Sequence, residues 1–194
     1  AEYLDTAPNP DVSEHAQAIY RTATAVVDLA EGVRSAERAL ERDEAPTRPL
    51  DTVLRHALEP FRDRSDVDIS ILYPNSQPPD IDERVEIVIE RLVESVIEHA
   101  ESNRTTIEIV VEHVADTLRL QVRDDGSVLP PTERAVLEGK PGTQLEHGRG
   151  IALRIVSWLI RTLGGEISVD KADTKGTVID LAFPASALAW SESE

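Results

Sequence analysis

The stretch that most constrains this chain is HGRGIALRIVSWLIRTLGGEISV, residues 147–169. Gly148 and Gly150 precede a long apolar run, and Gly164 begins a second glycine pair that closes the run. A glycine-rich turn at the start of a helix lets backbone N–H groups approach an anion, and the helix dipole favours negative charge there. The spacing predicts a mostly buried helix over 151–163, with Gly164 as its C-cap and a phosphate chain bound at its start. Taken alone, the pattern also fits an ordinary loop and core helix. The apolar residues of the run are Ile151, Leu153, Ile155, Val156, Trp158, Leu159, Ile160 and Leu163.

A second long helix is predicted over residues 82–101, because apolar residues recur there at the spacing of one helix face. These residues are Val85, Val88, Ile89, Leu92, Val93, Val96, Ile97 and Ala100. The other face carries Arg91, Glu94, Ser95 and Glu98, polar side chains about one turn apart. We expect these four side chains to line one site.

Segments of alternating polarity predict the strands of a sheet. VDISILY at 67–73 is one strand, and TTIEIVVEHV and TLRLQVRD, separated by two residues, form an antiparallel hairpin. The hairpin ends at an acidic turn, Asp124, Asp125 and Gly126. GTVIDLAFP near the C-terminus predicts a last strand.

The segments between these elements carry weaker signals. Residues 50–61 predict a short amphipathic helix, and the polar segment 43–49, with two prolines, predicts a linker. Residues 127–146 are rich in proline, glycine and charge, which predicts a mobile loop.

The N-terminal part predicts a long helix over about residues 10–42. Ile19, Val26, Val33 and Leu40 recur every seven residues, a coiled-coil-like seam that needs a partner helix. A long helix packed on its own domain is the alternative. Because the chain lacks methionine and opens on AEYLD, which resembles the end of a preceding helix, we expect it to be cut or processed from a longer polypeptide.

The acidic composition excludes some partners. The net charge of −17 comes from 37 acidic and 20 basic residues, so nucleic acid and anionic membranes would be repelled. Such a surface is typical of proteins from a high-salt cytoplasm, where charge repulsion is screened; an ordinary acidic protein is the alternative. No cysteine is present, which excludes disulfides and thiol chemistry. No segment approaches the ~18 apolar residues of a membrane span, so we expect a soluble, cytoplasmic protein without membrane contact by this segment.

The order of these motifs resembles the nucleotide-binding domain of sensor histidine kinases, in the wider fold shared with gyrase and Hsp90-type ATPases. ERLVESVIEHA resembles the N box, VRDDGSVLPP the first glycine box, HGRGIALRIVSWLIRTLGGEISV the second, and KGTVIDLAFP the closing strand. The TQLEHGRG lead-in and Trp158 are similar to kinases of halophilic archaea. The likeness covers about residues 50–184. It implies an α+β fold, a two-layer α/β sandwich of the Bergerat type with a mixed sheet covered by helices, preceded by a long dimerisation-type helix.

The resemblance also implies a domain division and roles for residues. Residues 1–44 would be the remnant of a dimerisation hairpin, 45–187 the ATP-binding domain and 188–194 an acidic tail. Asp124 would accept a hydrogen bond from the adenine amino group, which agrees with carboxylate chemistry; a solvated turn aspartate is the alternative. The nucleotide-binding residues implied are Arg91, Glu94, Ser95, Glu98, Asp124, Gly126, His147, Gly148, Gly150 and Thr177, and no catalytic residue is assigned.

The chain departs from the family pattern at the N box. Two asparagines are expected there, and Arg91 and Ser95 stand in their places, Ser95 at the usual magnesium-ligand position. A serine hydroxyl reaches less far than an amide carbonyl, so octahedral magnesium geometry is in doubt. Arg91 either pairs with phosphate or bridges Glu90 or Glu94. Val128 and Ala152 replace two further glycines of the pattern.

The resemblance implies ATP, with Mg²⁺, as cofactors, a homodimer through the 10–42 helix, and a response regulator receiver domain as partner. We expect the chain to transfer the γ-phosphoryl of ATP to a histidine upstream of residue 1, because none of its own histidines is followed by the family's acidic residue. These histidines are His15, His56, His99, His113 and His147. One alternative is a pseudokinase or protein-interaction module that has lost productive Mg-ATP binding. The weakest alternative is a gyrase-type ATP hydrolase with Glu94 as the base.

Overall fold

The fold is given by a computed structural model. It describes, besides Ala23, Ala30 and Arg34, residues 46–73, 79–100, 104–114, 117–140, 149–172, 175–184 and 188–189. The predicted seam over 10–42 and the residues His147 and Gly148 lie outside these ranges.

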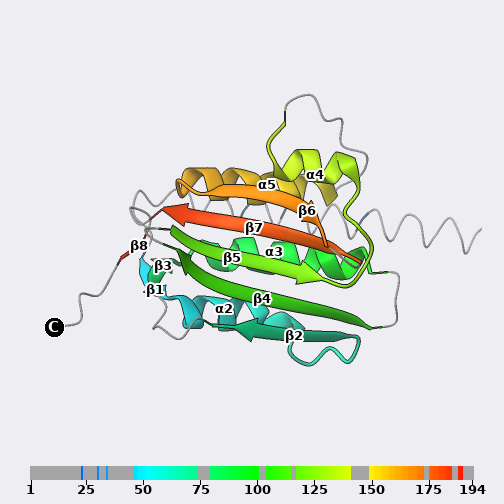
Figure 1. The fold of residues 1–194 in the computed structure, drawn as a ribbon, viewed down its shortest axis with the longest axis horizontal. Coiled ribbons are helices and arrows are strands. Elements are labelled where there is room, and N and C mark those ends of the chain that lie inside the picture. Colours follow the sequence, from blue (N-terminus) through cyan, green and yellow to red (C-terminus); the bar gives the residue numbers. More distant parts are fainter. Residues whose placement is uncertain are drawn as a thin grey trace, which may run out of the picture.

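A five-stranded mixed sheet forms one layer of the domain (Figure 1). Its strands are β2 (Val67–Leu72), β4 (Thr105–Val114), β5 (Thr117–Asp124), β6 (Glu166–Lys171) and β7 (Thr177–Pro184). The order is β2-β4-β5-β7-β6, with β2 parallel to β4 and the other neighbours antiparallel. The predicted hairpin is confirmed, with Val114 paired to Thr117 next to the turn.

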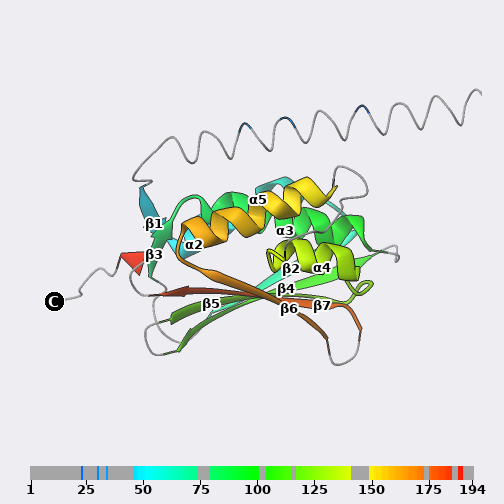
Figure 2. The same cartoon turned by 90° about the horizontal axis from the view of Figure 1, so that it is seen from above.

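The helices form the second layer and lie on one side of this sheet (Figure 2). They are α2 (Leu50–Leu58), followed by a 3₁₀ turn (Glu59–Phe61), α3 (Val85–Glu98), α4 (Pro131–Leu137) and α5 (Arg149–Thr162). Along β5, alternate side chains are buried because they face this layer. The α+β sandwich with a mixed sheet is therefore confirmed.

The predicted α3 face is the centre of the core. Val85, Val88, Ile89, Leu92 and Val93 are fully buried. They pack with the inward side chains of the sheet, so each contributes about 1.5–3 kcal/mol relative to exposure. This burial fixes the rotation of α3 about its axis, and it thereby sets the direction of the polar face.

Helix α5 confirms the predicted C-cap and corrects one detail. Gly164 has φ of +71°, a backbone conformation that favours glycine, and its N–H donates to the Arg161 carbonyl oxygen at 3.0 Å. The helix begins at Arg149, so Gly150 lies in its first turn. Trp158 is 45 % exposed, although the apolar run predicted a mostly buried helix. Trp158 lies on the solvent-facing side of α5, while Val156, Leu159 and Ile160 on the opposite side are buried.

The stretch 127–146, predicted as a mobile loop, contains the short helix α4. Pro131 stands at the helix start, where its fixed φ suits the first turn and no N–H is required. Leu129, Val136 and Leu137 are buried against the core. The prediction of a loop was wrong here because three apolar residues are too few to show a period against the surrounding prolines and charges.

A small second sheet holds the beginning and the end of the described domain together. It consists of β1 (Thr47–Pro49), β3 (Asp80–Asp82) and β8 (Leu188–Ala189) in the order β1-β3-β8. None of these strands was predicted. β1 lies in the predicted linker, and β3 includes Asp82, the expected start of the second helix, which begins at Val85 in the structure. Strands of two or three residues carry no readable alternation, so only pairing with distant segments defines them.

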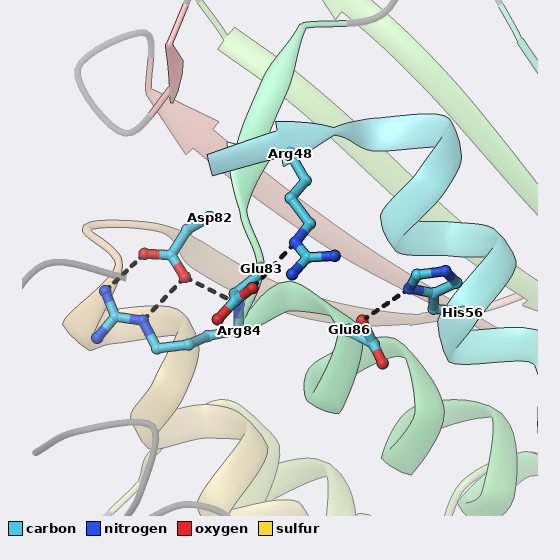
Figure 3. A network of polar contacts seen from close by, with 6 residues as sticks. All are labelled: Arg48, His56, Asp82, Glu83, Arg84 and Glu86. Carbon is cyan, nitrogen blue, oxygen red and sulfur yellow. Dashed lines mark hydrogen bonds and ion pairs between the residues drawn. The ribbon is translucent and has the colours of Figure 1, made fainter. Parts of the chain in front are cut away.

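Charged side chains fasten this small sheet to the start of α3 (Figure 3). Asp82 accepts hydrogen bonds from the Arg84 backbone N–H at 2.9 Å and from its guanidinium at 2.8 and 2.6 Å. Arg48 Nε on β1 donates to Glu83 Oε2 at 3.0 Å. His56 Nδ1 on α2 lies 3.7 Å from Glu86 Oε2 on α3. The two arginine contacts hold the N-terminal end of α3 in place.

Within the described residues, no helix is both long enough and apolar enough to cross a membrane.

Candidate functional site

Among the predicted site residues, Asp124 has a carboxyl group that is buried and hydrogen-bonded at both oxygens. It ends β5 at a position whose parity directs it toward the helix layer, and it is 9 % exposed. Its Oδ1 accepts from the Gly126 N–H at 2.7 Å, and its Oδ2 accepts from the Thr177 N–H at 3.0 Å. Asp125, by contrast, is exposed and accepts from the Thr106 N–H at 2.9 Å. The two neighbouring aspartates therefore have different surroundings.

Burial raises the pKa of Asp124 above its ordinary value of 3.8, while the N–H donors of Gly126 and Thr177 act in the opposite direction. An ionised carboxylate offers about four lone-pair positions, and two are used by these backbone donors. The group thus retains capacity to accept a hydrogen bond from a further donor, such as an exocyclic amine.

Two glycines let the chain pass close to this carboxylate. Gly176 has φ of +95°, and a Cβ there would lie 2.0 Å from the Asp124 carbonyl oxygen. A Cβ at Gly126 would lie 3.0 Å from Asp124 Oδ1, so glycine is favoured there by close approach. Gly176 was not among the predicted site residues, although the closing strand had been recognised. Its role follows from the register between β5 and β7, which the sequence does not show.

Thr177 joins three parts of the site. Its N–H donates to Asp124, and its Oγ1 accepts from the Leu129 N–H at 3.0 Å. Its side chain is buried. The segment leading into α4 is thereby fixed to the start of β7, beside the end of β5. Of the predicted site residues, Asp124, Gly126 and Thr177 are the three that the structure brings together.

The polar face of α3 carries an ion pair at the position of the altered N box. Arg91 Nη1 donates to Glu94 Oε2 at 2.6 Å. The Arg91 side chain is only 19 % exposed, while that of Glu94 is 42 % exposed. Of the two bridges considered from sequence, Arg91 therefore makes the one to Glu94. Glu98, the remaining acidic residue of the predicted set, is exposed at the end of α3.

His99, at the end of α3, connects this helix to α4. Its Nδ1 lies 2.7 Å from the Ser95 carbonyl oxygen, and its Nε2 lies 2.9 Å from Glu133 Oε2. Because a carbonyl oxygen only accepts, Nδ1 is the protonated nitrogen in this contact. From the sequence, His99 was considered only as a phosphoacceptor, and this contact was not predicted. The four-residue spacing between Ser95 and His99 was a signal for the contact within the helix. The contact with Glu133 on α4 depends on how the two helices pack, which the sequence does not show.

The end of α3 adjoins the Asp124 turn. The Ala100 Cα lies 3.9 Å from the position that a Cβ of Gly126 would occupy. Arg91, Ser95 and His99 follow one another at four-residue spacing, so they lie along the helix face that leads to this turn. From the order of the motifs we expect a cleft between this helix and the 127–146 segment, which stays a prediction because residues 141–148 lie outside the described ranges.

The described residues do not fit a magnesium site. Magnesium takes oxygen ligands in near-octahedral geometry, usually from one or two carboxylates and phosphates. No group of three histidine, aspartate or glutamate residues that could hold a metal occurs within the described ranges. At the expected metal position stands Ser95, and the carboxylate of the adjacent residue Glu94 is paired with the Arg91 cation. A fixed positive charge beside the position disfavours a second cation.

The model of the histidine kinase-, DNA gyrase B- and HSP90-like ATPases matches residues 80–187, more than half of the chain. A comparison with curated proteins gives no match.

Several solved structures that are similar to this chain are histidine kinases. The mycobacterial sensor histidine kinase MprB shares 20 % identity at a TM-score of 0.59, over 72 % of this chain and 97 % of its own. The Acinetobacter baumannii histidine kinase AdeS shares 19 % identity at 0.63, over 92 % and 86 %. Full-length ShkA in complex with AMPPNP shares 18 % identity at 0.67, over 95 % of this chain and 40 % of its own. At these identities the likeness shows the fold.

Proposed function

Because the chain belongs to the family of histidine kinase-, DNA gyrase B- and HSP90-like ATPases, we propose that it is the ATP-binding catalytic region of a two-component sensor histidine kinase. The observation that carries the proposal is the buried Asp124 carboxylate, held by two backbone N–H groups and flanked by two glycines. Such a carboxylate is suited to accept a hydrogen bond from the amino group of adenine.

With adenine placed at Asp124, the neighbouring residues would have the following roles in nucleotide binding. Gly126 and Gly176 let the backbone pass beside the base, and Thr177 keeps the turn and the α4 segment together. The phosphates would extend along α3 toward the start of α5, where Gly150 lies in the first helical turn. His147 and Gly148 would belong to the same phosphate end.

Catalysis in such a domain consists of positioning and charge stabilisation. The γ-phosphorus would be attacked by a histidine nitrogen upstream of this chain, and the bond to the β–γ bridging oxygen would break. The acceptor would reach the site in a homodimer formed through the 10–42 helix, and the phosphoryl group would pass to a response regulator receiver domain. All of these events would take place in the cytoplasm.

A pseudokinase or protein-interaction module is the second candidate, and the Arg91–Glu94 pair favours it. This pair flanks Ser95, the residue at the position that the resemblance implies for the magnesium ligand. Under this alternative the adenine would bind at Asp124, but the γ-phosphate would not be oriented for transfer. A hydrolase that uses Glu94 as its base has less support, because Glu94 is engaged with Arg91.

Three measurements test the proposal. Calorimetric titration at high salt with ADP and with AMPPNP should show saturable binding, and a chain extended upstream to include an acceptor histidine should become phosphorylated by ATP. Binding without phosphorylation would leave the pseudokinase as the better account. Absence of binding of both nucleotides would reject the ATP-binding function and would leave a protein-interaction module with this fold. Sedimentation of the extended chain should give a dimer, and a monomer at micromolar concentration would contradict the dimerisation proposal.

A further inference from the structure

Arg91 supplies a fixed cation where the described residues offer no magnesium site. Its guanidinium lies on the α3 face that leads through Ser95 and His99 to the Asp124 turn. The side chain is mostly buried, so its position is restricted, and Nη1 is the atom engaged with Glu94. A guanidinium has five N–H donors in a planar fork, so donors remain that a phosphate is able to use in bidentate fashion.

The Arg91–Glu94 pair is of a kind that a phosphate is able to displace. The two residues are three apart on one helix, and Glu94 is 42 % exposed. Ion pairs between residues three apart on one helix contribute little to stability, and the Glu94 carboxylate stays accessible to water although Arg91 is mostly buried. A phosphate chain carries more negative charge than one carboxylate, so Arg91 would exchange Glu94 for the nucleotide at small cost.

We propose that Arg91 binds the phosphates of the nucleotide in place of a divalent cation, so that the domain takes adenine nucleotides as metal-free anions. Glu94 then competes with the phosphates for the same guanidinium and limits the affinity. This inference rests on the proposed function, since it concerns the phosphate end of the same nucleotide site.

The test is calorimetric titration of the wild-type chain with AMPPNP, once in EDTA and once with millimolar magnesium, at equal ionic strength. The expected dissociation constant in magnesium is equal to that in EDTA or higher, because Mg²⁺ neutralises the phosphates that Arg91 binds. A tenfold or greater loss of affinity in EDTA would overturn the proposal.

Two variants at the pair give opposite expected effects. Arg91→Met keeps the length of the side chain and removes its charge, so affinity for AMPPNP in EDTA should fall about tenfold while affinity for adenosine stays unchanged. Glu94→Gln removes the competitor, so affinity for AMPPNP in EDTA should rise about threefold. Unchanged affinity in Arg91→Met would overturn the proposal.

Arg62→Met is the matched control, because Arg62 forms the same kind of ion pair with Glu59, at 2.9 Å and three residues apart. The charge change is identical, and AMPPNP binding should stay within about twofold of wild type. An equal loss in both arginine variants would contradict a specific role for Arg91. Failure of the wild-type chain to bind AMPPNP or adenosine in either buffer would reject the proposed function itself, and the inference with it.

Discussion

The two ends of the proposed nucleotide site differ in how fully the protein prepares them. At the base end, both oxygens of Asp124 have backbone donors, and the surrounding turn is held by Thr177. At the phosphate end, Arg91 is paired with Glu94, and Ser95 stands at the position that the resemblance implies for the magnesium ligand. The base end thus depends on a backbone geometry that tolerates few substitutions. The phosphate end depends on side chains of one helix face, of which Arg91 is mostly buried and Glu94 is more exposed, and it does not depend on a backbone turn.

The largest expected effect lies at the base end, in Gly176→Ala. The added Cβ would be strained at φ of +95° and would meet the Asp124 carbonyl oxygen at 2.0 Å. We expect a loss of about 2–5 kcal/mol in the free energy of unfolding and loss of nucleotide binding. Urea denaturation monitored by circular dichroism measures the first of these.

Gly164→Ala is the control for Gly176, because φ there is also positive, +71°, while the nearest atom is 4.0 Å away. Only backbone strain applies, so we expect a loss of about 1–2 kcal/mol with nucleotide binding preserved. Equal destabilisation by the two substitutions would contradict the close approach to Asp124.

The second effect is that of Asp124→Asn on nucleotide affinity. An amide offers one oxygen, so its NH₂ group would face one of the two backbone donors, and the charge-assisted bond to adenine would be lost. The expected decrease is about 10–100-fold, corresponding to about 1.5–3 kcal/mol. Asp125→Asn, whose wild-type carboxylate contacts only the β4 backbone, should bind normally in the same calorimetric titration.

Acid should weaken nucleotide binding through Asp124 before an ordinary aspartate would protonate. Burial raises the folded-state pKa of this carboxyl above 3.8, and the protonated group loses its charge and one acceptor position. Affinity should therefore fall as pH decreases through a value above 3.8, and Asp124→Asn should lack this transition.

The same raised pKa of Asp124 affects folding stability in the opposite direction: acid weakens nucleotide binding, but it increases the contribution of this group to stability. A folded-state pKa above the unfolded one means that the folded chain binds the proton more tightly. This contribution to stability is present below 3.8 and is lost as pH rises through the folded-state pKa. Comparison of urea midpoints of wild type and Asp124→Asn across this range should reveal it, and parallel profiles would contradict the raised pKa.

The smallest expected effect is at the phosphate end, in the double variant Arg91→Asn with Ser95→Asn. Two amide side chains would restore the family pattern, and the amide oxygen is a suitable magnesium ligand. Affinity for AMPPNP should become about three- to tenfold higher with magnesium than with EDTA. An equal affinity in both buffers would show that other residues exclude the metal.

The elements that were predicted from the sequence are those in which an apolar pattern repeats over many residues. The face of α3 and the β4–β5 hairpin follow from apolar spacing alone, and Gly164 marks the end of α5. Helix α4 and the strands of the small sheet are too short to show a period, so distant partners define them.

The same distinction applies to the candidate site. Asp124, Gly126 and Thr177 were predicted as site residues from local motifs, and the structure places them in contact, while their nucleotide-binding roles stay predictions. Gly176 and the His99–Glu133 contact depend on strand register and on helix packing, which no local motif records.

The most direct test of the central claim is a titration of the isotopically labelled chain with AMPPNP in EDTA, followed by amide and arginine side-chain NMR. The account predicts shifts of the Gly126 and Thr177 amides with both adenosine and AMPPNP, and a shift of the Arg91 side-chain signal with AMPPNP only. Gly126 and Thr177 amides that stay in place at saturating nucleotide would contradict binding of the base at Asp124.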